Sequence, residues 1–149
     1  ACLSPKAVRG FVASEADGEE PVWSVACSAF HSLALTVKGD LFAWGKGEEG
    51  QLGLGPTERS AKKPARVSVS GVDWIACAAT HSMAVTRGGQ LWVWGDPRAV
   101  ASVFEDEEPD EKPQKKDKAP PPVLPDQPRL VKRLSGRVEQ VACGAGLSL

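Results

Sequence analysis

Short apolar runs, separated by glycines or prolines, make up most of the hydrophobic pattern of this chain. The segment Val22–Gly45 reads VWSVACSAFHSLALTVKGDLFAWG, with Val, Leu, Phe and Trp in runs of four to six residues. Such runs predict β-strands. The pairs Lys38-Gly39 and Gly88-Gly89 stand between two runs and predict tight hairpin turns, because glycine accepts a positive φ. Since no segment keeps a helical period over a dozen residues, the pattern predicts an all-β protein.

The strand pattern repeats along the chain. Val72–Gly95 reads VDWIACAATHSMAVTRGGQLWVWG and is identical to Val22–Gly45 at 12 of 24 aligned positions, at an offset of 50 residues. A third copy, VEQVACGAGLSL, opens at Val138 and is cut off at Leu149. A P-x-x-V word precedes each copy, beginning at Pro5, Pro64 and Pro128. Short strands that recur about every 50 residues predict propeller blades of about four strands each.

Three words of the repeat, H-S-L-A-L-T, F-A-W-G and G-Q-L-G-L-G, occur in this order between Val22 and Gly55. In these words the chain resembles the regulator of chromosome condensation repeat family. The second repeat departs from the family pattern after Gly95, where Asp96-Pro97 replaces the glycine-rich word. The resemblance implies a seven-bladed β-propeller, of which this chain would supply an arc of about two complete blades plus part-blades.

The repeat divides the chain into five expected segments. They are the tail of a preceding repeat with a short acidic insertion (1–21), the first repeat with a following linker strand (22–71), the second repeat (72–104), an acidic and proline-rich disordered insertion (105–128) and the start of a truncated third repeat (129–149). About two and a half units fall short of the roughly four blades that a closed propeller needs. The chain also begins with Ala, and its only methionine is Met83. We therefore expect a fragment, or an arc that needs further blades from the parent chain or another chain.

The repeat words supply residues that we expect to hold the blades together and not to catalyse. His31 and His81 occupy equivalent positions, and Leu147 stands in their place in the third copy. One histidine per blade predicts that the two lie too far apart to share a metal, and each is expected to make a structural hydrogen bond. The expected structural signature is His31, Gly39, Trp44, Gly45, Gly50, Gln51, Leu52, Gly53, Gly55, His81, Gly89, Trp94 and Gly95.

The insertion differs in composition from the repeats. It holds eight acidic residues, four basic residues and seven of the 12 prolines, so it is expected neither to fill a core nor to pair as a central strand. We interpret it as a solvated linker, with Glu105, Asp106, Glu107 and Glu108 as candidate partner-binding residues. The whole chain has a formal net charge of −1, which argues against strong direct binding of nucleic acid.

Cofactor and metal sites are not indicated by the sequence. Cys27, Cys77 and Cys143 recur at one place in the repeat, but no C-x-x-C pair exists. We expect these thiols to be small buried groups in a reducing, intracellular setting, cytoplasmic or nuclear. The segment Gly45–Gly50 matches G-x-G-x-x-G formally, but the glycines and proline that follow predict no helix, so a dinucleotide site is not expected. No cofactor is predicted.

The functional prediction is a protein–protein interaction scaffold without enzymatic activity. Trp23 and Trp74 are out of register with each other, and either is a candidate exposed contact with a partner. The resemblance also allows two alternatives, guanine-nucleotide exchange on a small GTPase and the substrate-recruiting propeller of a larger ubiquitin ligase or kinase. Expected partners are therefore other proteins, a small GTPase among them. No apolar run approaches the length of a membrane span, so no membrane contact is predicted.

Overall fold

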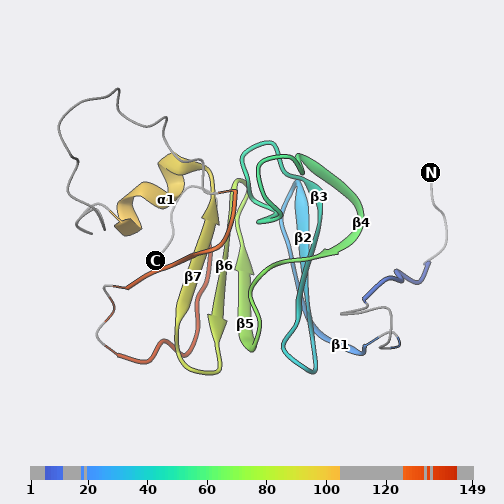
Figure 1. Cartoon of the computed structure of the whole chain (residues 1–149), viewed down its shortest axis with the longest axis horizontal. Helices are drawn as coiled ribbons and strands as arrows, with labels where there is room; N and C mark the ends of the chain where they lie inside the picture. The colour runs from blue at the N-terminus through green and yellow to red at the C-terminus, as the bar shows by residue number, and fades with distance from the viewer. Residues whose placement is uncertain are drawn as a thin grey trace.

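The computed structural model describes residues 6–11, 18, 20–104, 126–132, 134 and 136–143. Two four-stranded antiparallel sheets stand side by side (Figure 1). The first sheet has the order β1-β2-β3-β4 and the second the order β5-β6-β7-β8. The strands are β1 (Val22–Cys27), β2 (His31–Thr36), β3 (Leu41–Lys46), β4 (Ser60–Arg66), β5 (Val72–Cys77), β6 (His81–Thr86), β7 (Leu91–Gly95) and β8 (Arg129–Leu130). The predicted β-propeller arc is confirmed, with one blade per repeat.

The register of the two blades is the same. Val22 pairs with Thr36 and Val72 with Thr86, and each blade has a bulge directly after this pair. In the first blade the bulged residue is Trp23. A bulge turns one side chain away from the ladder and leaves it unpaired. The repeat therefore fixes both the strands and the position of their irregularity.

The main core lies between the two blades. Strand β5 packs against β1 and β2, and buried side chains of the first blade, such as Leu33 and Leu35, meet Ile75 and Ala84 of the second. Alternation along a strand sends neighbouring residues to opposite faces of the sheet. Odd-numbered residues of β2 therefore face the second blade. The equivalent residue of β6, Met83, faces away from the first blade into a smaller cluster.

Helix α1 (Pro97–Phe104) follows β7 and packs against it, and the sequence pattern did not predict it. Asp96 caps its first turn, because the Asp96 carboxylate accepts a hydrogen bond from the Arg98 amide at 2.9 Å. Proline at the first helical position has no amide to leave unpaired. The helix replaces the glycine-rich loop that follows β3 in the first blade.

Two predicted boundaries differ from the structure. Strand β8 pairs with β7 and completes the second blade, whereas the sequence placed residues 129–130 at the start of the third repeat. The expected insertion 105–128 also ends earlier, since Asp126 is 4% exposed. Residues 105–125, with the candidate partner residues Glu105, Asp106, Glu107 and Glu108, lie outside the described part of the chain.

Candidate functional site

The junction between the blades is built around His31, which is 2% exposed. Its Nε2 lies 2.7 Å from the Ser82 hydroxyl of the second blade, and its Nδ1 lies 2.9 Å from the Ser28 hydroxyl. The Ser82 hydroxyl donates its only proton to the Gln51 carbonyl at 2.9 Å. Ser82 must then accept from Nε2, so the His31 ring carries a proton on Nε2.

The two histidines are electrostatically coupled. Burial and, to a smaller extent, the nearby His81 together lower the pKa of His31 to about 4, so its imidazole is neutral at pH 7. Burial also lowers the pKa of His81, while the Asp96 carboxylate acts in the opposite direction. The sequence predicted two histidines too far apart to share a metal; in the structure they are close enough for one to affect the pKa of the other. Among the described residues, no hydrogen-bond partner faces either ring nitrogen of His81.

Trp94 packs the second blade against the glycine-rich loop of the first blade. Its side chain is fully buried, and its Nε1 donates to the Gln51 carbonyl at 2.9 Å. Gly53 has a φ of +69°, and a Cβ at this position would come within 2.7 Å of Trp94 Nε1. Gly53 is therefore required both by its backbone conformation and by the close approach of the indole. The Gln51 carbonyl accepts from both Ser82 and Trp94.

A backbone seam continues the junction at the other end of the strands. The Gly39 carbonyl accepts from the Val72 amide at 3.0 Å, and the Gly89 carbonyl accepts from the Val138 amide at 3.1 Å. These two hydrogen bonds join equivalent residues of successive repeats. Residues 138–143 therefore begin the third repeat in the same position relative to the second blade as β5 has relative to the first.

The predicted signature residues lie mostly inside the molecule. Trp44 and Gly45 are half-buried. The buried members are His31, Gly39, Gly50, Gln51, Leu52, Gly53, Gly55, His81, Gly89, Trp94 and Gly95. The structure brings His31, Gln51, Gly53 and Trp94 together at the junction, while Trp44 lies on the opposite face of the first blade. That these residues hold the blades together stays a prediction.

A contact missed by the sequence analysis pins the end of the insertion to the first blade. The Asp126 carbonyl accepts from the Gly55 amide at 2.9 Å, and the Asp126 carboxylate accepts from Arg59 Nη1 at 3.1 Å. Gly50 leaves the space for it, since a Cβ there would lie 2.6 Å from Asp126 Oδ1. An aspartate among prolines has the composition of a linker, so no sequence signal pointed to this contact.

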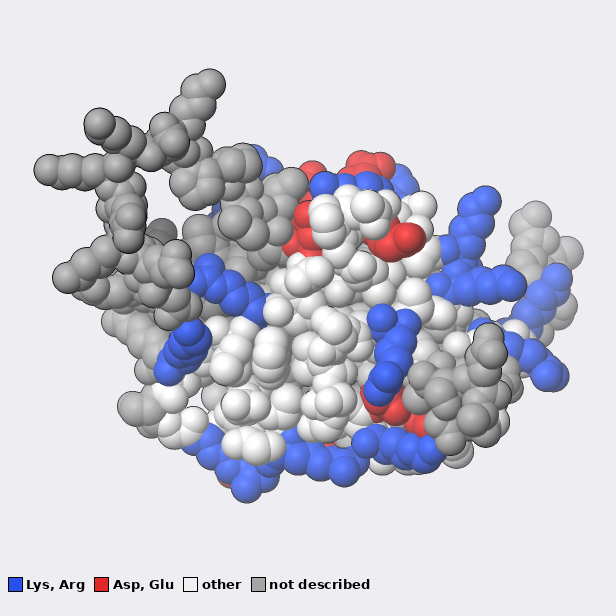
Figure 2. All heavy atoms as spheres, in the orientation of Figure 1, with Lys and Arg blue, Asp and Glu red and all other residues white. Residues whose placement is uncertain are grey.

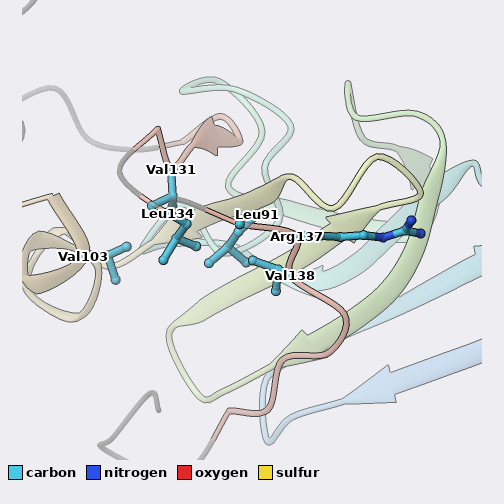
Figure 3. A pocket seen from close by; sticks show the side chains of 7 residues that line it. Leu91, Val103, Val131, Leu134, Arg137 and Val138 are labelled. Carbon is cyan, nitrogen blue, oxygen red and sulfur yellow. The ribbon is translucent and has the colours of Figure 1, made fainter.

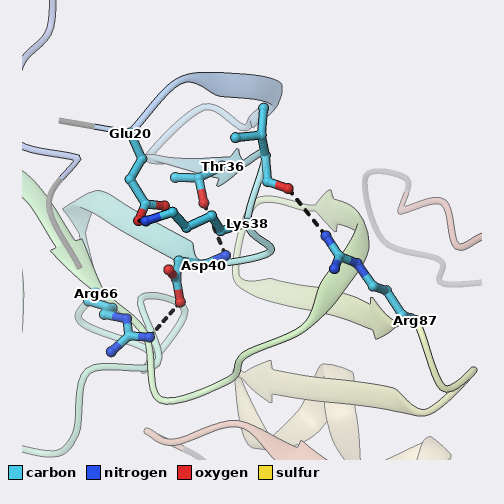
Figure 4. Close-up of polar contacts among 7 residues, drawn as sticks. Glu20, Thr36, Lys38, Asp40, Arg66 and Arg87 are labelled. Atoms are coloured by element: carbon cyan, nitrogen blue, oxygen red, sulfur yellow. Dashed lines mark hydrogen bonds and ion pairs between the residues drawn. The ribbon is translucent and has the colours of Figure 1, made fainter. Parts of the chain in front are cut away.

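Polar contacts fasten the hairpin end of the first blade (Figure 4). The buried carboxylate of Glu20 pairs with Lys38 at 2.7 Å. Arg66 pairs with Asp40 across β3 and β4. Arg87 of the second blade reaches across the junction and donates to the main-chain carbonyl of residue 37 at 3.2 Å. This end of the blades is therefore rigidly held while its outer side chains stay exposed.

The cysteines differ from the prediction in their burial. Cys27 is exposed, and Cys77 and Cys143 are half-buried. Burial, then the thiols of Cys27 and Cys143, raise the pKa of Cys77 to about 12. The expectation of a buried Cys27 is wrong because this residue lies on the face of β1 that has no preceding blade beside it. All three are free thiols, and among the described residues no group of three or more His, Cys, Asp and Glu side chains could hold a metal.

Large apolar side chains are exposed on the first blade. Val25 is 62% exposed, while its equivalent in the second blade, Ile75, is 7% exposed because the first blade covers it. Trp23 is 56% exposed, and the equivalent Asp73 is also exposed although a blade lies beside it. Val25 therefore occupies a blade-contact position, whereas the Trp23 position stays at the surface even next to a neighbouring blade.

A hollow of about 590 Å³ opens on the far face of the second blade (Figure 3). Leu91, Val131 and Val138 line it, with Leu134 and Arg137 at its side. The equivalent positions of the first junction, Leu41, Val67 and Val72, are each at most 1% exposed. The first junction is covered by the whole second blade, whereas only residues 138–143 of the third repeat are described beside the hollow. The hollow therefore lies on the face of the second blade where a following blade would pack.

No helix in the described ranges is both long and apolar enough to cross a membrane.

Comparisons with known proteins agree with the geometry of the repeat. Residues 38–85 and 24–51 each match the regulator of chromosome condensation (RCC1) repeat. The chain is 42% identical over 55 residues to the human protein named probable E3 ubiquitin-protein ligase HERC3, which covers 36% of this chain and 5% of that protein. It is 42% identical over 52 residues to human Protein RCC2, which covers 35% of this chain and 10% of that protein.

A solved structure extends the similarity over most of the chain. The crystal structure of human WBSCR16 is similar with a TM-score of 0.66 at 30% sequence identity. The similarity covers 87% of this chain and 30% of that one. This chain thus spans less than a third of the length of each protein compared.

Proposed function

This chain carries regulator of chromosome condensation repeats in a partial β-propeller, and we propose that it binds other proteins through the exposed ends of its blades. Repeat-equivalent residues at the junction are used for packing, as Trp94 and His31 show. Residues at the hairpin end differ between the blades: Trp23 is replaced by Asp73, and Val37 by Arg87. Exposed residues that vary between blades, on strands that do not vary, are typical of a surface that binds other proteins.

One observation carries the proposal. Trp23 and Val37 are 56% and 51% exposed at the same end of the first blade, where Val22 pairs with Thr36. Their equivalents Asp73 and Arg87 stay exposed beside a neighbouring blade, so a preceding blade would leave Trp23 and Val37 accessible too. Exposed tryptophan is enriched among residues that dominate the energy of protein interfaces.

The test compares two variants of the complete parent protein. Trp23→Ser with Val37→Ser should reduce co-purification of its partners at least about tenfold, because losing a buried tryptophan from an interface costs 2 kcal/mol or more. Phe30→Ser is the matched control, since Phe30 is 48% exposed at the opposite end of β1. Equal recovery of every partner by the double variant and the wild-type protein would refute the proposal.

The similarity to HERC3 favours one specific context, a propeller that recruits substrates for a ubiquitin ligase. Substrates that co-purify with the parent protein should then lose ubiquitin conjugates when these repeats are deleted. Binding to a small GTPase stays a prediction. It is checked by the release of labelled GDP from a panel of such proteins, where no acceleration would exclude exchange activity.

A further inference from the structure

In the part of the chain that the structure describes, four basic side chains make no ion pair, hydrogen bond or ring contact: Lys6, Arg9, Lys62 and Lys63. The other described basic residues each interact with an acid, a carbonyl, a ring or another group. They are Lys38, Lys46, Arg59, Arg66, Arg87, Arg98, Arg129, Lys132 and Arg137.

Three of the unpartnered cations, Lys62, Lys63 and Arg9, form what we call the β4 basic patch. The pairing of β3 with β4 is interrupted so that Lys62, Lys63 and Pro64 together lie opposite one residue of β3. Both lysines are exposed on this bulge. Gly10 lies beside it, since a Cβ at Gly10 would be 4.0 Å from Pro64 Cδ. Arg9, next to Gly10, is thereby brought to the same side of the blade as Lys63, next to Pro64.

The surface view agrees with this placement. Lys and Arg side chains project from the side of the molecule where Figure 1 places β4 and the described N-terminal segment (Figure 2). Neighbouring like charges repel one another, and none of these side chains has an ion pair with an acidic group. A basic cluster of this kind is stabilised when a partner brings negative charge to it.

The geometry of β4 limits how a partner can bind. A bulge and a proline on an edge strand remove the regular row of amides that an added strand needs. Recognition must therefore occur through side chains.

We propose that the β4 basic patch binds an acidic segment of a partner protein. This inference rests on the proposed scaffold function and names the chemistry of one partner surface. An acidic polypeptide is favoured over nucleic acid because the chain as a whole has a formal net charge of −1, which argues against strong direct binding of nucleic acid.

Fluorescence anisotropy of the 149-residue chain with two labelled peptides tests the proposal. One peptide alternates acidic residues with serine, and the other alternates glutamine with serine. Lys62→Glu with Lys63→Glu should weaken binding of the acidic peptide at least about tenfold, since reversed charges repel the ligand. Arg98→Glu is the control, because it reverses an exposed charge on α1 of the second blade, and it should change the affinity less than about twofold.

A further arm identifies the ligand class. A labelled 20-base-pair DNA duplex that binds more tightly than the peptide, and is released by the Lys62/Lys63 reversal, would overturn the assignment to an acidic protein segment. Circular dichroism verifies folding, and Lys62→Gln with Lys63→Gln replaces the reversal if that variant does not fold.

Equal loss of peptide binding in the patch variant and the Arg98→Glu control, or no binding of the acidic peptide by the wild-type chain, would overturn the proposal. The scaffold function is tested separately by Trp23 and Val37 on co-purified partners, so failure of the patch leaves that result standing. Likewise, if only the Trp23/Val37 variant loses its co-purified partners, the peptide-binding result for the β4 basic patch is unaffected.

Discussion

The two blades share their strands and differ in what joins them. In the first blade the glycine-rich loop after β3 offers the Gln51 carbonyl to Trp94 and Ser82 of the next blade. In the second blade α1 stands in place of this loop, and the following linker is two residues longer. The first junction is closely packed, while the face of the second blade beside Leu91 holds a hollow where only residues 138–143 of the third repeat are described. Equal strands therefore do not bring equal connectors, and in the first blade the connector itself contacts the next blade.

The largest expected effect contrasts Trp94 with its equivalent Trp44. Trp94→Ala should lower the free energy of unfolding by about 3–5 kcal/mol, because it empties a fully buried site. Trp44→Ala should cost about 1 kcal/mol, since Trp44 is half-buried on a face without a neighbouring blade. Urea denaturation of the two variants measures the difference, and equal costs would contradict the assigned junction. Trp94→Phe keeps most of the volume and serves if the alanine variant does not fold.

The second prediction concerns the neutral His31 at the junction. Between pH 6.5 and about 4 the unfolded chain binds more protons than the folded one, because burial holds the pKa of His31 at about 4. Stability should therefore be fully present above pH 6.5 and fall by about 2 kcal/mol as the pH drops to 4.5. His31→Gln should remove that part of the decline. An identical pH profile for the variant and the wild type would show that His31 does not titrate this way.

A third comparison uses the serine that links the blades. Ser82→Ala should cost about 1–2 kcal/mol, because it leaves the His31 Nε2 proton buried without an acceptor. Ser32, the equivalent residue on the open face of the first blade, is half-buried. Ser32→Ala should change stability by less than about 0.5 kcal/mol. If thermal unfolding gives the two variants the same midpoint, the hydrogen-bond chain through Ser82 is not a stabilising part of the junction.

The smallest expected difference compares the two linkers. Val67→Ala should cost about 2 kcal/mol, since Val67 is 1% exposed in the packed junction. Val131→Ala should cost about 1 kcal/mol, because Val131 already borders a hollow into which its neighbours can move. Denaturant midpoints of the two variants measure this difference. A larger cost at Val131 would indicate that the second junction is as well packed as the first.

The repeat made the propeller blades predictable from the sequence, because equal words at a fixed spacing must fold into equal units. The junction was less predictable. His31 was expected to make a hydrogen bond, but its partner Ser82 lies 51 residues away and becomes a neighbour only when the blades pack. Helix α1 has eight residues, which is too short for a periodic pattern, although Asp96-Pro97 is a typical helix start. The burial of Asp126 depends on its contacts with Gly50 and Gly55 in another repeat, which the local composition around Asp126 cannot reveal.

The route of the chain through Asp126 has a consequence for the order of folding. The described chain stops at the end of α1 in the second blade and resumes at Asp126, which contacts the first blade. It then continues into β8, which pairs with β7. The second sheet can acquire its fourth strand only after residue 130 has left the ribosome, and closing so long a connection costs more entropy than closing a hairpin. We expect β8 to dock late and slowly, as strands with distant partners do. During synthesis the nascent second blade therefore exposes one edge of β7 for longer than the first blade exposes β3.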